Sequence, residues 1–294
     1  MNIHFAMGAE YHKQHFVDIK AKLEERGHIC SYEDNDQEVA IMSDAGCTIL
    51  TNAKKLYNMN HNLCSKNTFW IHSTRDEKMN DREKGMTHLV PSKWYVERLN
   101  KLGRDAIAIG CPRLDKAIGI EPIENRAFYI NTCHRTITSH YDIGKKIYEL
   151  PYDLKVKYHP YYAKQGGCIY DENINQTYPD SCKDGSIEQN IAEAQVVISD
   201  YATASIDSVM MNRPTILYYN KCYGESIYYN TDNVEIIFSK CAHICFTLED
   251  IKAAAEQVMG GVDEHRVLRQ HASEQLWDYK GTGLDRIAEV IENG

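Results

Sequence analysis

Short apolar runs alternate with segments of helical periodicity along most of the chain. Residues 2–7 and 28–33 predict strands, and residues 12–27 between them predict an amphipathic helix that ends at a glycine. A strand, a helix and a strand at this spacing are typical of a parallel βαβ unit, so the N-terminal half is expected to form an open α/β sheet. Further strands are expected over residues 47–52, 68–72, 88–92 and 106–112, with a helix over 93–103.

The periodicity lapses around residues 116–126, and a second alternation of the same kind follows. We therefore expect two α/β domains, residues 1–120 and residues 121–294. Ser186 followed by Gln189 predicts a capping box at the start of one helix of the second domain. The second domain is expected to contain strands over 127–133, 154–160, 195–200 and 214–219, and helices over 141–150, 186–194, 204–212, 247–260 and 283–293.

Net charge, the length of apolar runs and cysteine spacing argue against several classes of protein. The net charge of −9 at pH 7 argues against non-specific nucleic-acid binding, which requires a surplus of Lys and Arg. No window approaches the run of about 20 apolar residues that a membrane span needs, and the N-terminal segment lacks the features of a signal peptide. The ten cysteines occur without a C-x-x-C pair, so free thiols in a reducing, cytoplasmic compartment are expected.

Polar residues follow the predicted strands at several positions. In open α/β sheets ligands bind beyond the carboxyl ends of the strands, so these residues are the candidates for binding and catalysis. A single histidine at such a position is more often structural, but several polar clusters at strand ends favour one site. The clusters are residues 72–74, 110–115, 132–135, 159–160 and 199–207.

The last of these clusters lies between two apolar runs, within residues 196–219. A strand that ends in Ser199-Asp200, followed by small residues and a helix, places backbone amides at a helix N-terminus, where a phosphate is favoured. This pattern indicates an anion-binding site. The alternative is plain helix capping by Thr203 or Ser205, which needs no ligand.

Metal sites are not predicted. There is no D-x-D motif between a strand and a helix of the kind that metal-dependent sugar transferases use, and residues 34–36 are more simply a solvated acidic turn. Residues 241–245, "CAHIC", have thiol and imidazole spacing, but without a second pair they favour a buried strand over a zinc site. We expect no resident metal or cofactor.

An ordered set of motifs resembles the CDP-glycerol glycerophosphotransferase family of teichoic acid and capsule synthesis. The motifs are Trp70-Ile71-His72-Ser73-Thr74, Gly110-Cys111-Pro112-Arg113-Leu114-Asp115, Asn131 to Arg135, His159-Pro160, and Ser199 to Thr203 with Asp207 and Arg213-Pro214. The resemblance covers roughly residues 68 to 220. It departs from the family at Ser73, where the family has a glycine, and at Ala202-Thr203, where the family has a Ser-Ser pair.

The resemblance implies a GT-B fold, in which two Rossmann-like domains face each other across a cleft. It implies that residues 1–120 serve the acceptor and residues 121–294 bind the nucleotide donor. His72 would take the proton from the acceptor hydroxyl, and His159 would bind the donor phosphates; imidazole suits both tasks. Further donor-binding residues would be Thr132, Arg135, Ser199, Asp200, Thr203 and Asp207, with Ser73, Thr74, Arg113 and Asp115 in support.

The function implied is transfer of a glycerol-phosphate or related polyol-phosphate group from a CDP-activated donor to a hydroxyl acceptor in cell wall biogenesis. The resemblance also implies a lipid-linked acceptor and contact of the protein with the inner face of the membrane. A GT-B glycosyltransferase with a UDP- or GDP-sugar donor and a non-catalytic nucleotide-binding module remain alternatives. A UDP-sugar 2-epimerase shares the fold but is disfavoured, because Tyr201-Ala202-Thr203 stands where such enzymes are rich in glycine.

Overall fold

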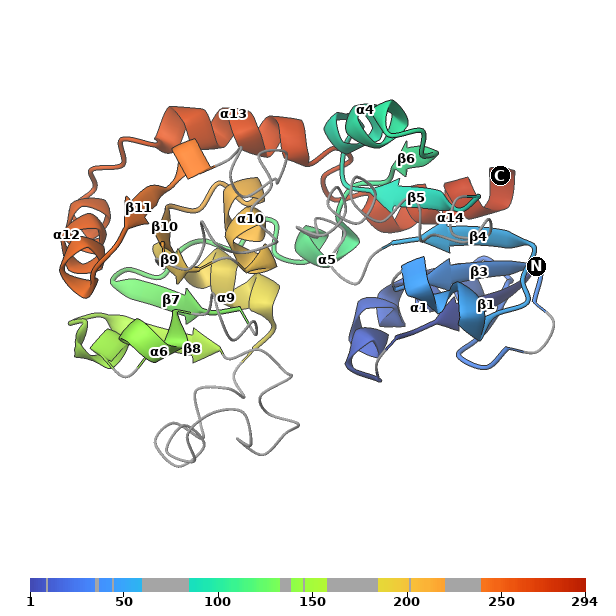
Figure 1. Cartoon of the computed structure of the whole chain (residues 1–294), viewed down its shortest axis with the longest axis horizontal. Helices are drawn as coiled ribbons and strands as arrows, with labels where there is room; N and C mark the ends of the chain where they lie inside the picture. The colour runs from blue at the N-terminus through green and yellow to red at the C-terminus, as the bar shows by residue number, and fades with distance from the viewer. Residues whose placement is uncertain are drawn as a thin grey trace. The chain divides into compact units, whose positions relative to one another are not determined.

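The chain forms two compact units in the computed structural model (Figure 1). Unit 1 comprises Met1–Asp115 and Gln275–Gly294, and unit 2 comprises Lys116–Glu274. We expected residues 121–294 to form the second domain, but the C-terminal segment Gln275–Gly294 belongs to unit 1. The structure describes residues 1–8, 10–34, 37–43, 45–59, 85–132, 139–144, 146–157, 185–200, 202–219 and 239–294.

Unit 1 contains a parallel sheet, with six strands among the residues described, in the order β2-β1-β3-β4-β5-β6. Most positions of these strands are buried, as expected for a parallel sheet that is covered on both faces. The strands are β1 (Asn2–Ala6), β2 (Ile29–Ser31), β3 (Val39–Met42), β4 (Lys55–Asn58), β5 (Thr87–Val90) and β6 (Ala106–Ala108).

The helices of unit 1 include one from the far end of the chain. Helix α14 packs against α1, and ion pairs join Lys22 to Asp285 at 2.8 Å and Arg26 to Glu292 at 2.9 Å. The described helices of this unit are η1 (Glu10–His15), α1 (Val17–Glu25), η2 (Ala45–Leu50), α4 (Lys93–Lys101), α5 (Pro112–Asp115) and α14 (Gly283–Asn293).

Unit 2 repeats this architecture around a second parallel sheet, in the order β11-β10-β9-β7-β8. The strands are β7 (Arg126–Ile130), β8 (Asp153–Lys157), β9 (Val196–Ser199), β10 (Thr215–Tyr218) and β11 (His243–Cys245). The helices are α6 (His140–Ile143), η4 (Lys146–Glu149), α9 (Ile187–Glu193), α10 (Thr203–Met210), η6 (Ser239–Cys241), α12 (Leu248–Met259) and α13 (Arg266–Leu276).

Two apolar clusters show how helices cover the sheet of unit 2. On one face, Ile198 and Ile216 of the central strands pack with Ile251 of α12. On the other face, Val197 packs with Ile191 of α9 and Ala204 of α10. Because neighbouring residues of a strand point to opposite faces, the continuous apolar run of β9 supplies both clusters.

Most of the predicted elements are confirmed. Strands β1 and β2 flank α1 and pair in parallel, as the spacing predicts. The predicted capping box is half formed: the Ser186 hydroxyl accepts a hydrogen bond from the Gln189 amide at 3.1 Å and so caps α9, whereas the Gln189 side chain donates to Glu193. The strand predicted at residues 241–245 is confirmed in part: β11 spans His243–Cys245, and its middle residue, Ile244, is exposed. Among the described residues, no helix has both the length and the apolar character needed to cross a lipid bilayer.

Other predictions are wrong or incomplete. Residues 47–52 do not form a strand: residues 47–50 belong to the 3-10 helix η2 and residues 51–52 to no helix or strand, while β3 and β4 on either side of it were not predicted. A short apolar run cannot be assigned to helix or strand by periodicity, and here the sheet is completed by neighbouring segments. The predicted helix over 141–150 is two short pieces, α6 and η4. The predicted strand at 68–72 lies outside the described residues.

Candidate functional site

The strand order of unit 2 reverses between β7 and β9. The chain places β8 on one side of β7 and then returns to place β9 on the other side. Ligands of open α/β sheets bind at the carboxyl ends of the strands at such a switch point. The residues that follow the two strands there are Asn131 and Thr132 after β7, and Asp200 after β9.

The Asp200 carboxylate joins two segments at this point. One oxygen accepts from the Thr132 amide at 2.7 Å, and the other accepts from the Ser139 amide at 2.7 Å and the Ser139 hydroxyl at 2.8 Å. Asp200 is only 1% exposed. Hydrogen bonds to a charged acceptor are about twice as strong as neutral ones, so this carboxylate holds both ends of segment 133–138.

Further hydrogen bonds connect Ser139 and Ser199 to residues of β7. The Tyr129 and Ser139 hydroxyls lie 2.8 Å apart, and the Ser199 hydroxyl donates to the Ile130 carbonyl at 2.9 Å. Tyr129, Ser139 and Ser199 have no exposed surface. Asp200 and Ser199 therefore act, in the described contacts, as positioning groups for the end of β7, Thr132 and Ser139.

Helix α10 begins just beyond Asp200. Its N-cap is Ala202, and no side chain of the described residues caps the helix there. The Ser205 hydroxyl instead donates back to the Ala202 carbonyl at 2.7 Å. Capping by Thr203 or Ser205, the alternative from sequence, is therefore wrong: Thr203 is the first helical residue. Asp207 lies within the helix and is 2% exposed.

Asp115 has its described partners in unit 1. Its carboxylate accepts from the amides of Gly281 at 2.7 Å and Gly283 at 2.9 Å, and so holds the start of α14. Burial raises the pKa of Asp115, and the two amide hydrogen bonds oppose that shift. Arg113 lies on α5 in the same unit. The described contacts of Asp115 thus anchor the C-terminal helix.

The sheet of unit 1 has a polar cluster at its own switch point, between β1 and β3. The Ser43 hydroxyl follows β3 and accepts from the Gly8 amide at 3.0 Å, and His12 Nδ1 lies 2.9 Å from it. His12 is 3% exposed. Sequence reasoning missed this cluster, because β3, which ends directly before Ser43, was not predicted as a strand.

The structure brings together only part of the predicted site. Thr132, Ser199 and Asp200 meet at the switch point of unit 2, with Thr203 and Asp207 on the following helix. Ser139 was missed, because nothing in its local sequence marks it as a partner of Asp200. Five predicted residues lie outside the described part of the chain: His72, Ser73, Thr74, Arg135 and His159.

Comparisons with known proteins bear on the fold. No protein-family model matches the chain, and no curated protein matches its sequence. A variant of the wall teichoic acid polymerase TagF soaked with CDPG is 12% identical, with a TM-score of 0.64 over 99% of this chain and 88% of that one. The UDP-GlcNAc 2-epimerase of Neisseria meningitidis bound to UDP-GlcNAc is 9% identical, with a TM-score of 0.59 over 100% of both chains.

A third similar structure is the UDP-GlcNAc 2-epimerase of Methanocaldococcus jannaschii in complex with UDP-GlcNAc and UDP. It is 10% identical, with a TM-score of 0.52 over 100% of both chains. Fold similarity at this level of identity carries no function by itself. These likenesses, together with the two parallel sheets, establish that the chain has the GT-B fold of two Rossmann-like α/β units.

Proposed function

We propose that the chain is a transferase that moves a glycerol-phosphate or related polyol-phosphate group from a CDP-activated donor to a hydroxyl acceptor. The observation that carries the proposal is the Asp200 carboxylate, which holds Thr132 and Ser139 at the switch point of unit 2. These residues bound the segment that contains Arg135. A cation contributed by Arg135 between these two anchored residues would suit the phosphates of a nucleotide donor.

In the proposed reaction the acceptor oxygen forms a bond to the phosphorus of the transferred group. The bond from that phosphorus to the bridging oxygen breaks, and the nucleoside monophosphate leaves with the electron pair. His72 takes the proton of the acceptor hydroxyl, and His159 and Arg135 stabilise the negative charge on the leaving phosphate. The similarity to a wall teichoic acid polymerase soaked with CDPG supports a CDP-linked donor.

A UDP-sugar enzyme is the second candidate, because two of the similar structures hold UDP-GlcNAc. The two candidates are separated by a thermal-shift screen of the purified chain with CDP-glycerol, CDP-ribitol, UDP-sugars and GDP-sugars. Stabilisation by the CDP compounds alone is expected. Stabilisation by UDP- or GDP-sugars alone would replace the first candidate with the second, and no response to any would favour a non-catalytic role.

The role of His72 is tested by His72→Ala with the donor that the screen identifies. Transfer to the acceptor should fall by at least about 100-fold, the usual contribution of a general base, while donor binding stays within about twofold. His271→Ala is the matched control, because His271 is an exposed histidine of α13. Substantial transfer by His72→Ala would refute the assignment of the base.

A further inference from the structure

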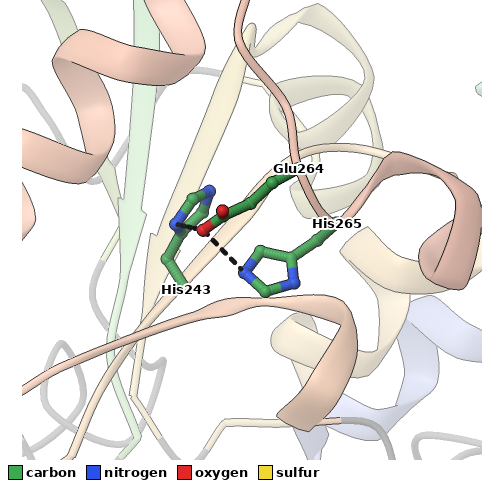
Figure 2. Close-up of side chains that lie close together, drawn as sticks. All are labelled: His243, Glu264 and His265. Atoms are coloured by element: carbon green, nitrogen blue, oxygen red, sulfur yellow. Dashed lines mark ion pairs between the residues drawn. The ribbon is translucent and has the colours of Figure 1, made fainter.

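Three side chains in unit 2 converge on one point, away from the residues assigned above (Figure 2). His243 is the first residue of the edge strand β11, and Glu264 and His265 precede α13. Their ligand atoms all lie within 4.8 Å of one another. Strand β10 separates β11 from β9, so this group is not part of the cluster around Asp200.

The separations within this group are too long for hydrogen bonds. One oxygen of Glu264 lies 3.7 Å from His243 Nδ1 and 3.6 Å from His265 Nε2. A direct hydrogen bond between such atoms would measure about 2.7–3.2 Å. Ligand atoms about 2.1 Å from a tetrahedral zinc ion lie roughly 3.4 Å apart. The two distances to Glu264 are a few tenths of an ångström longer than that, and all three ligand atoms lie within 4.8 Å of one another.

The orientation of His265 also suits a metal ligand. Its Nδ1 lies 3.0 Å from the carbonyl oxygen of Lys240, which can only accept, so Nδ1 carries a proton. In the neutral ring the lone pair is then on Nε2, the atom that faces Glu264. A hydrogen bond from the second ring nitrogen to a backbone carbonyl is the usual support of a histidine that binds a metal.

His243 is buried, and the ring nitrogen that faces Glu264 is Nδ1. It is 8% exposed, and its Nε2 has no hydrogen-bond partner among the described residues. The two rings meet edge to face, with centroids 4.6 Å apart, so both present nitrogen to the same carboxylate.

We propose that His243, Glu264 and His265 form a binding site for zinc or a similar divalent transition metal. Two imidazoles and one carboxylate are a donor set that zinc accepts, whereas Mg²⁺ and Ca²⁺ prefer oxygen ligands. Glu264 is 66% exposed and an open pocket of about 580 Å³ adjoins the group, which leaves room for water as the fourth ligand. The ion would tie β11 to the start of α13.

The site is tested by isothermal titration of Zn²⁺ into the metal-stripped, tag-free full chain under reducing conditions. Glu264→Gln and His265→Gln are the test variants, and the exposed Glu264 can be changed without disturbing the core. His271→Gln, an exposed histidine of α13, is the matched control. The wild type and the control should bind one zinc ion equally, and the test variants at least about 100-fold more weakly, beyond the usual effect of losing a second-shell partner.

Because the chain has ten cysteines, Co²⁺ serves as an optical probe of the ligands. The wild type and His271→Gln should give the strong visible bands of four-coordinate cobalt without sulfur-to-cobalt charge transfer, and Glu264→Gln should lose these bands. Absence of zinc binding in the wild type would overturn the proposal. So would unchanged binding in Glu264→Gln, or a spectrum dominated by thiolate ligands in every variant.

Discussion

The Asp200 carboxylate offers the sharpest test of how the proposed donor site is built. In Asp200→Asn one oxygen remains and can still accept from the Thr132 amide. The new NH2 group meets the Ser139 amide, which now donates to the carboxylate at 2.7 Å, so a donor faces a donor. The Ser139 hydroxyl must turn to accept. The variant thus loses one charge-assisted hydrogen bond and weakens two others.

The expected cost follows from these contacts. A hydrogen bond to a charged group contributes about 1.5–3 kcal/mol, and a buried donor left without an acceptor costs about 1–3 kcal/mol more. Because Asp200 is 1% exposed, no discount for solvent applies. We expect Asp200→Asn to lower the free energy of unfolding by roughly 3–5 kcal/mol, a large part of the 5–15 kcal/mol typical of a protein.

Urea unfolding measures this loss, and amide hydrogen exchange locates it. The Thr132 and Ser139 amides should be protected in the wild type and exchange much faster in the variant. Asp153→Asn is the matched control on the same sheet, since Asp153 is 46% exposed and its ion pair with Arg126 is worth at most about 1 kcal/mol. An Asp200→Asn protein within about 1 kcal/mol of the wild type, with both amides still protected, would refute the reasoning.

Three further predictions concern stability. Burial lowers the pKa of His88 to about 4, below the usual 6.5 of histidine, so its contribution to stability is complete above pH 6.5 and is lost as the pH falls toward 4. About 3 kcal/mol should disappear over this window in urea unfolding, and His88→Gln should flatten the pH dependence. In Gly283→Ala the new Cβ would lie 2.8 Å from the Asp115 carboxylate, which holds the start of α14. The melting temperature should therefore drop by the equivalent of about 1–3 kcal/mol, and an unchanged melting temperature would contradict this close contact. Thr247→Ala removes the hydroxyl that caps α12 at 3.1 Å and should cost about 1 kcal/mol in urea unfolding, more than Thr282→Ala, whose side chain makes no cap hydrogen bond to α14.

Local patterns predicted the class of fold well. Apolar runs of strand length and helices with one apolar face indicate parallel α/β units, because burial on both faces of a sheet leaves that signal in each segment. They failed at the strand predicted over residues 47–52, where residues 47–50 belong to the 3-10 helix η2. Such a short apolar run is equally compatible with either state until its neighbours occupy the sheet.

The candidate site was predictable only in part. Asp200 and Thr132 were found because each follows an apolar strand, and sequence reveals strand ends. Their hydrogen bond joins residues 68 positions apart, and the Ser139 hydroxyl reaches Asp200 across 61 positions. No local pattern encodes such a pairing, because it depends on which strands become neighbours.

The sequence by itself determined that this protein forms parallel α/β units with polar residues at the strand ends, since hydrophobic periodicity acts within each segment. Only the tertiary structure decided which of those polar groups meet. It assigned Asp115 to the start of α14, Asp200 to the loop after β7, and His243 to Glu264 and His265. The reason is that these contacts follow from strand order and helix packing, which arise from long-range burial of apolar surface and not from the residues nearby in the chain.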